Sequence, residues 1–236
     1  MISICSVCAR GGSKGVPNKN LAPINGIPLI AYSLIQAKEA NLFDVIACSS
    51  DSAEILEVAK EFGAEILVRR PNDMALDTSP KIPVIRHCML SVEESLGLKT
   101  DFIVDLDATA PVRDPRHIKG VYELVQESAV TNVITGVPSR KSPYFNLVEL
   151  VSDGSSTYPT LSKSCSKEIT RRQDAPRCFD MNASIYAWKR ESLLSMDSLF
   201  GVGTRLYEMP EVTAFDVDTE IDLEIVKTLM DKYAFN

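Results

Sequence analysis

Histidine is scarce in this chain, and long apolar runs are missing. Only two histidines occur among the 236 residues, His87 and His117, and both fall in segments that we expect to be helical. A histidine-based metal centre or a Ser-His-Asp relay is therefore poorly supported, although a single histidine base stays open. No apolar run approaches the ~20 residues of a membrane-crossing helix. The short apolar start is followed at once by Arg10, unlike a signal peptide. We expect a cytoplasmic protein with no membrane partner.

Cysteine is present, but not in the arrangement of a metal site. The six cysteines are Cys5, Cys8, Cys48, Cys88, Cys165 and Cys178. Cys5 and Cys8 have the C-x-x-C spacing, but residues i and i+3 of a strand point to opposite faces, and no second pair completes a zinc site. We therefore expect buried structural thiols.

Acidic residues are absent from the start of the chain, although the protein carries a net charge of −7. The first of them is Glu39, whereas Arg10, Lys14, Lys19 and Lys38 precede it. An acidic protein with one cationic segment suits a small anionic ligand better than a long polymer. We therefore expect no nucleic-acid partner.

The cations cluster in a glycine-rich segment, residues 9–20, which we call the basic loop. It follows the apolar run 2–8, which predicts a buried strand. Glycines at 11, 12 and 15 let the backbone approach a ligand, and successive amide N–H groups form a concavity that binds anions. The spacing fits neither G-x-G-x-x-G nor the Walker A loop, because Lys14 precedes Gly15. We predict a polyphosphate ligand; the alternative is a basic, solvated turn.

Beyond the basic loop, strands alternate with helices. The predicted strands cover residues 2–8, 44–50, 64–68, 102–106, 130–137, 181–188, 205–209 and 213–217. The predicted helices cover residues 28–39, 51–63, 81–98, 115–128 and 219–233. Asp51 and Glu54 predict a capping box for the second helix, and Asn25-Gly26 predicts a tight turn. The alternation predicts an α/β fold, a mostly parallel sheet with helices on both faces.

Residues 139–177 break this rhythm, because they are rich in Ser, Pro, Lys and Arg and have little apolar periodicity. Such a stretch inside a compact domain usually has a function, here covering the site or pairing with a second subunit. We therefore divide the chain into an α/β domain of residues 1–138 and 181–236 and an inserted arm of residues 139–180 that dimerises or caps the substrate.

Two carboxylate pairs follow predicted strands, Asp105 with Asp107 and Asp216 with Asp218. Residues i and i+2 project to one side of a strand, and Mg²⁺ prefers one or two carboxylates with waters and substrate phosphates. Either pair could instead form a turn or a cap, and Asp218 could cap the last helix. Beside a polyphosphate loop, a metal at one pair is the better interpretation. Together these parts predict a nucleotidyltransferase, in which a hydroxyl attacks the α-phosphorus and pyrophosphate leaves.

The basic loop, with Lys19-Asn20 at its end, resembles the signature of the acylneuraminate cytidylyltransferases, which make CMP-activated sialic acids from CTP. Further matching motifs follow in family order and span nearly the whole chain: Ser49-Ser50-Asp51, Arg70-Pro71, Asp77-Thr78, Pro111-Val112-Arg113, Arg171-Arg172-Gln173, Asn182-Ala183-Ser184-Ile185-Tyr186 and Asp216-Val217-Asp218-Thr219-Glu220. The resemblance implies a Rossmann-like nucleotidyltransferase fold, a homodimer, and CTP and a keto-sugar acid as substrates.

The resemblance also implies roles for individual residues. The catalytic residues would be Arg10, Lys14 and Lys19, which hold the triphosphate, and Asp218. The other nucleotide-binding residues would be Ala9, Gly11, Gly12, Ser13, Asn20, Arg70, Ala75 and Asp77. The Mg²⁺ ligands would be Asp216 and Asp218. The sugar-binding residues would be Asp107, Thr109, Arg172, Gln173 and Tyr186, with Arg172 on an arm that reaches a neighbouring subunit.

Two departures from the sialate pattern bear on the sugar. Members that use sialate read Gln-Pro-Thr-Ser-Pro-Leu-Arg where this chain reads residues 107–113, so Asp107 replaces the Gln of the sugar site. The chain also reads Asn182-Ala183-Ser184 where they read Asn-Gly-Ala. Both resemble members that activate legionaminic acid, a diacetamido relative of sialic acid, and we expect that substrate.

Three alternatives stay open at this point. The substrate could be 3-deoxy-manno-octulosonate or pseudaminic acid. The chain could be a glycosyltransferase that uses Asp105 and Asp107 as its metal motif. It could also be a nucleotide-sensing regulatory domain without catalytic activity.

Overall fold

The first apolar run forms an inner strand of the main sheet. The computed structural model describes residues 1–13, 15–165 and 169–233, so Lys14 lies outside the described residues. These residues form a seven-stranded sheet in the order β11 (Thr204–Glu208), β7 (Asn132–Pro138), β10 (Phe179–Lys189), β6 (Phe102–Leu106), β1 (Ser3–Cys8), β4 (Val45–Ser50) and β5 (Ile66–Arg69). β10 is antiparallel to both neighbours, and the other pairings are parallel. The predicted, mostly parallel sheet is confirmed.

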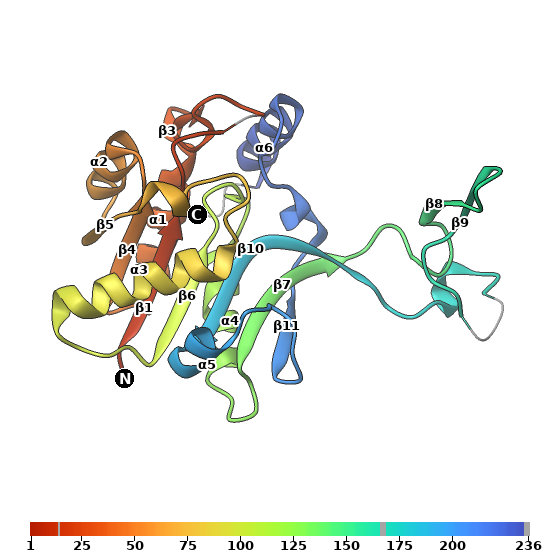
Figure 1. The fold of residues 1–236 in the computed structure, drawn as a ribbon. Helices are drawn as coiled ribbons and strands as arrows, with labels where there is room; N and C mark the ends of the chain where they lie inside the picture. The colour runs from red at the N-terminus through yellow and green to blue at the C-terminus, as the bar shows by residue number, and fades with distance from the viewer. Residues whose placement is uncertain (14, 166–168, 234–236) are drawn as a thin grey trace.

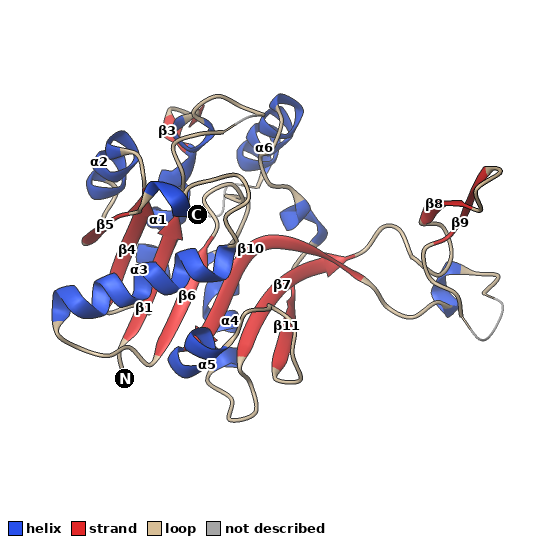
Figure 2. Cartoon of the chain, in the orientation of Figure 1, coloured by secondary structure: helices blue, strands red, loops and turns tan. Residues whose placement is uncertain are grey.

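Helices cover both faces of this sheet (Figures 1 and 2). The helices packed on one face are α1 (Leu29–Ala40), α2 (Ala53–Glu61) and α4 (Pro115–Val125). The helices on the other face are α3 (Lys81–Leu96) and α5 (Arg190–Ser195), the second of which sequence reasoning missed. A third apolar cluster joins the closing helix α6 (Glu220–Lys232) to the start of α1 through Val226 and Leu29. None of the described helices is both long and apolar enough to span a bilayer.

Two local predictions are wrong. Residues 213–217 do not form a strand in the described chain: a 3₁₀ turn, Glu211–Ala214, is followed by a segment that crosses the carboxyl end of the sheet. Its Val217 amide donates to the Thr109 carbonyl (2.8 Å). The cap of α2 is Ser52 rather than Asp51, because the Ser52 hydroxyl accepts from the Ile55 amide. The predicted turn at residues 25–26 is confirmed as the link between β2 (Pro23–Ile24) and β3 (Ile27–Pro28).

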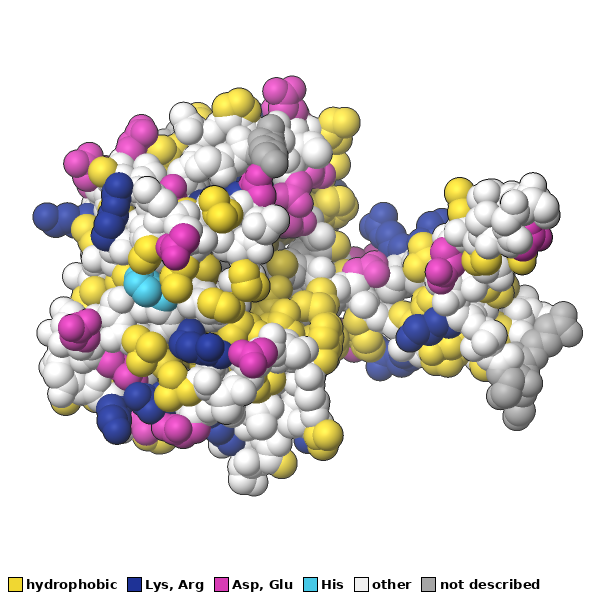
Figure 3. Space-filling model, viewed as in Figure 1, with side chains coloured by type: hydrophobic (Ala, Val, Ile, Leu, Met, Phe, Trp, Pro, Cys, Tyr) yellow, Lys and Arg dark blue, Asp and Glu magenta, His cyan; other side chains and the backbone are white. Residues whose placement is uncertain are grey.

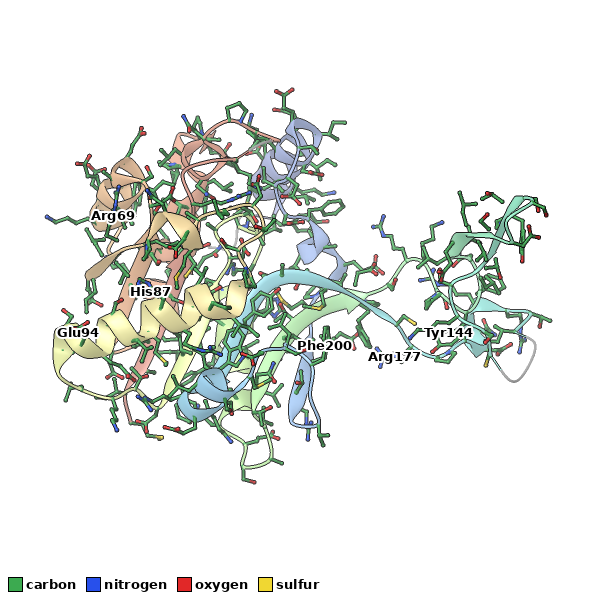
Figure 4. The ribbon with its side chains drawn as sticks, viewed as in Figure 1. Arg69, His87, Glu94, Tyr144, Arg177 and Phe200 are labelled. Atoms are coloured by element: carbon green, nitrogen blue, oxygen red, sulfur yellow. The ribbon has the colours of Figure 1, made fainter. Side chains whose placement is uncertain are left out.

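Residues 139–178 leave the body after β7 and return through β10 (Figure 1). They contain a hairpin of β8 (Val148–Ser152) and β9 (Thr157–Leu161), whose residues are all exposed. Figure 3 shows this part of the chain as a separate lobe on a narrow neck, and Figure 4 places Tyr144 in the lobe, beyond Arg177.

The loop after β6 is fixed by a buried arginine. Arg113 is fully buried, and burial lowers its pKa to about 10 despite the nearby Asp107. Its guanidinium donates to the Ala110 carbonyl (2.7 Å), the Ser184 carbonyl (2.8 Å) and the Ser33 hydroxyl (2.9 Å). It also donates to the Asp107 carbonyl. One side chain thus ties the loop after β6 to β10 and α1.

Replacement of this arginine tests its role. We expect Arg113→Met to lower the free energy of unfolding by about 3 kcal/mol, because several buried oxygens lose their donor. Urea unfolding measures the change. Arg116→Met is the matched control, since that side chain is exposed and forms its ion pair with Asp114, and its effect should be much smaller. Equal losses for the two variants would contradict this account.

Candidate active site

A cavity of about 310 Å³ opens at the carboxyl ends of β1 and β6, where open α/β sheets bind ligands. The basic loop forms one wall, and the segment before α6 forms another. The residues that line the cavity are Cys8, Ala9, Arg10, Ser13, Lys19, Asn20, Arg70, Met74, Leu76, Asp77, Ser79, Lys81, Val84, Asp107, Ala108, Thr109, Asp216 and Asp218. The structure thus brings most of the residues predicted for the nucleotide and the metal to one place.

Two hydrogen bonds fix the conformation of the basic loop. The Gly11 amide donates to Asp51 Oδ1 (2.9 Å), so Asp51 anchors the loop instead of capping α2. The Lys19 amide donates to Ser13 Oγ (3.1 Å), which closes the loop across its middle. These bonds hold the loop at the wall of the cavity, where Ala9, Arg10 and Ser13 are among the lining residues.

Polar groups on the floor of the cavity are placed to meet a ligand. Asn20 Nδ2 donates to the Arg10 carbonyl (2.9 Å), while the buried Asn20 Oδ1 has no hydrogen-bond partner among the described residues. Arg70 is buried and donates to the Ser49 carbonyl (2.8 Å). Arg10 forms an ion pair with Asp77 across the cavity. An unsatisfied amide oxygen in a buried wall is unfavourable unless a ligand supplies a donor.

The basic loop directly contacts the segment before α6. Lys19 Nζ lies 2.8 Å from Asp218 Oδ1. Gly15 lies so close to this segment that a Cβ atom on it would stand 2.0 Å from the Asp218 carbonyl oxygen. Only glycine permits such an approach. The predicted meeting of the loop with the carboxyl-terminal acid pair is therefore found in the structure.

The acid pair faces the cavity with its charges close together. Burial raises the pKa of Asp216, and the neighbouring Asp218 and Asp107 raise it further. The cap of α6 is Thr219, which forms a capping box with Asp222, so Asp218 is not used as a cap. Among the described residues, no group of three or more His, Cys, Asp or Glu is arranged to hold a metal ion. A cation here would therefore have two protein carboxylates and would need oxygens from a ligand.

Sequence reasoning missed Lys81, the first residue of α3. Its Nζ lies 2.6 Å from Asp107 Oδ2 and 3.5 Å from Asp105 Oδ2. Burial raises the pKa of Asp107, but Lys81 and the hydrogen bonds from Thr109 outweigh this effect and bring the pKa to about 2. Burial raises the pKa of Asp105, which is almost fully buried and accepts from Ser6 Oγ (2.7 Å). A cation in the first turn of a helix is unfavourable with respect to the helix dipole. The position of Lys81 at the start of a predicted helix was therefore the signal in the sequence that this side chain has a specific partner.

Several residues expected at the site are not among those that line the main cavity. Arg172 and Gln173 line a separate cavity of about 400 Å³ in residues 138–178. Tyr186 is buried, and its ring centroid lies 4.4 Å from Lys81 Nζ, beneath that side chain. The residues that line the main cavity include Met74 and Leu76 but not Ala75. Gly11 and Gly12 belong to the basic loop but not to the described lining.

A larger residue at position 15 should displace the basic loop. We expect Gly15→Ala to weaken CTP binding by about tenfold or more, because the added methyl group separates the loop from Asp218. Isothermal titration calorimetry measures the affinity. Gly201→Ala is the control, since the nearest atom to its added Cβ would be 3.8 Å away. Unchanged affinity in Gly15→Ala would contradict the close approach.

Comparison with known proteins identifies the family. A family model described as cytidylyltransferase matches residues 4–234. The chain is 48% identical over 96% of its length, and 94% of the relative, to the post-translational flagellin modification protein B of Campylobacter coli. It is 47% identical, with the same coverage, to a CMP-N,N'-diacetyllegionaminic acid synthase of Campylobacter jejuni.

A solved structure shares the fold. It is the structure of CMP:2-keto-3-deoxy-manno-octonic acid synthetase complexed with CTP, with a TM-score of 0.72 and 19% identity. The match covers 98% of this chain and 99% of the other. The fold is thus shared with that structure, and the family model together with the two relatives shows that the chain belongs to the cytidylyltransferase family.

Proposed function

We propose that this chain activates a nine-carbon 2-keto sugar acid of the legionaminic or sialic type with CTP. The anomeric hydroxyl attacks the α-phosphorus, the bond to the bridging oxygen breaks, and pyrophosphate leaves with the CMP-sugar as the other product. The observation that carries this proposal is the contact between the basic loop and the acid pair, Lys19 to Asp218, at the wall of one cavity. A triphosphate needs a cationic cradle and a metal-binding pair within one site.

The nucleotide would be held by groups from three segments. Arg10, Lys14, Lys19 and the amides of the basic loop would bind the phosphates. Asn20, with its unpaired Oδ1, and Arg70 would bind the nucleoside. These groups position the α-phosphorus and neutralise the charge of the leaving pyrophosphate.

The acid pair fits Mg²⁺. Burial and then the charge of Asp218 raise the pKa of Asp216, and a bound cation would favour the charged form of Asp216. Mg²⁺ prefers one or two carboxylates together with waters and phosphate oxygens. Asp216 and Asp218 would hold the ion, which when bound would supply positive charge that stabilises the transition state. Lys19 would then break its ion pair with Asp218 and pair with a substrate phosphate.

The structure favours this pair over the alternative pair after β6. Asp105 is almost fully buried, and its oxygens already accept from Ser6 and Lys81. Asp107 is bound by Thr109 and Lys81. A glycosyltransferase that used Asp105 and Asp107 for its metal would first have to break these contacts.

The sugar is proposed from two observations. One relative that is 47% identical is named for diacetyllegionaminic acid. The two departures from the sialate pattern, at Asp107 and Ala183, lie together, because the Asp107 amide donates to the carbonyl of Ser184 (3.1 Å). Pseudaminic acid and 3-deoxy-manno-octulosonate are the competing substrates.

The function is tested by following pyrophosphate release with CTP, Mg²⁺ and a panel of sugar acids. We expect the highest kcat/KM with legionaminic acid, lower values with sialic and pseudaminic acids, and the lowest with the eight-carbon acid. Release with none of them would contradict the proposal.

The same assay tests the metal pair. Asp218→Asn should lower kcat by about a hundredfold or more, because it removes a charged ligand. Asp231→Asn, at the far end of α6, is the matched control and should retain activity. Full activity in Asp218→Asn would place the metal elsewhere.

We also propose that residues 139–180 are an arm that forms a homodimer, with residues 1–138 and 181–236 as the catalytic domain of a cytoplasmic enzyme. Leu150 on β8 is 72% exposed and Val148 is 57% exposed, although both are apolar. Exposed apolar strands usually mark an interface. Arg172 and Gln173 on this arm would then reach the partner's sugar site.

Sedimentation velocity tests the dimer. We expect a dimer at micromolar concentrations, and Leu150→Glu should convert it to a monomer by placing a charge in the interface. Val202→Glu, at a fully exposed apolar residue on the body, is the control and should remain dimeric. A monomeric wild-type protein would contradict the arm's role.

A further inference from the structure

Lys81 pairs with two carboxylates beside the cavity that it lines. Its ammonium group lies 2.6 Å from Asp107, 3.5 Å from Asp105 and 4.4 Å from the ring centroid of Tyr186. The two carboxylates accept from its N–H donors, and the electron-rich face of the Tyr186 ring favours its charge. The shortest polar contact of Lys81 is therefore with the side chain of Asp107.

The carboxylate of Asp107 is fixed in orientation by these contacts. Its Oδ1 accepts from the Thr109 amide (3.0 Å) and the Thr109 hydroxyl (2.9 Å), and its Oδ2 accepts from Lys81. Each carboxylate oxygen can accept about two hydrogen bonds. One acceptor position on Oδ2 therefore remains, on a side chain that is 20% exposed and lines the cavity.

The charge of Lys81 matters because the site must admit an acid. Asp107, Asp216 and Asp218 all line the cavity, and a sugar acid brings a further negative charge. An uncompensated Asp107 would repel this substrate. With Lys81 beside it, Asp107 keeps an acceptor oxygen but presents little net charge.

We propose that Lys81 is a positioning residue for sugar specificity, which holds Asp107 as an oriented, charge-compensated acceptor for an N–H or O–H donor of the sugar acid. This inference rests on the proposed function of the site. It assigns to Lys81 an action through Asp107, without contact between Lys81 and either substrate.

A double-mutant cycle tests this coupling. The variants are Lys81→Met, Asp107→Asn and the double variant, assayed for the KM of the sugar acid, the KM of CTP and kcat. Lys81→Met should raise the KM of the sugar acid by about tenfold or more, with the KM of CTP within about twofold. In the Asp107→Asn background, Lys81→Met should raise the KM of the sugar acid by less than about threefold, because a neutral amide needs no compensating cation.

The other outcomes overturn the inference. Additive effects would show that Lys81 contacts the sugar directly, and equal changes in both KM values with a lower melting temperature would show a purely structural role. If Lys81→Met folds poorly, Lys81→Gln, which keeps a donor but no charge, gives the same comparison. A wild-type enzyme that releases no pyrophosphate with any sugar acid would refute the proposed function instead.

Discussion

The contact between Lys19 and Asp218 joins the two ends of the chain, 199 residues apart in sequence, at the carboxyl edge of the sheet. It depends on Gly15, where any side chain would collide with the Asp218 carbonyl. The cationic and anionic halves of the site are thus held together before a substrate enters. In the proposed reaction, substrate phosphates and a metal ion would replace this ion pair with little rearrangement, because both charges already lie at the wall of the cavity.

The loop after β6, on another wall of the cavity, depends on two cations, the buried Arg113 and the partly exposed Lys81. Arg113 fixes the backbone of the loop after β6 by donating to carbonyl oxygens, and Lys81 fixes the Asp107 side chain within that loop. The neighbouring residue Ala183 has φ of 50°, in the left-handed region that favours glycine. This conformation costs roughly 1–2 kcal/mol for a residue with a Cβ. It also explains why a glycine is acceptable there in the sialate pattern.

Features that depend on residues close together in the sequence could be predicted from it. The apolar runs predicted the strands, and glycines with cations predicted the anion-binding loop at residues 9–20. The roles of Asp51, Lys81 and Arg113 could not be predicted, because each is defined by partners distant in sequence. Asp51 was assigned to the nearest helix although it anchors Gly11. Residues 213–217 were expected to form a strand, but a 3₁₀ turn covers residues 211–214, and the Val217 amide donates to the Thr109 carbonyl in the loop after β6.

A crystal structure with a non-hydrolysable CTP analogue and Mn²⁺ would test the central claim most directly, because anomalous scattering locates the ion. We expect Mn²⁺ between the carboxylates of Asp216 and Asp218 and the phosphates, with Lys19 moved from Asp218 to a phosphate oxygen. An ion at Asp105 and Asp107, or phosphates bound away from the basic loop, would contradict the account.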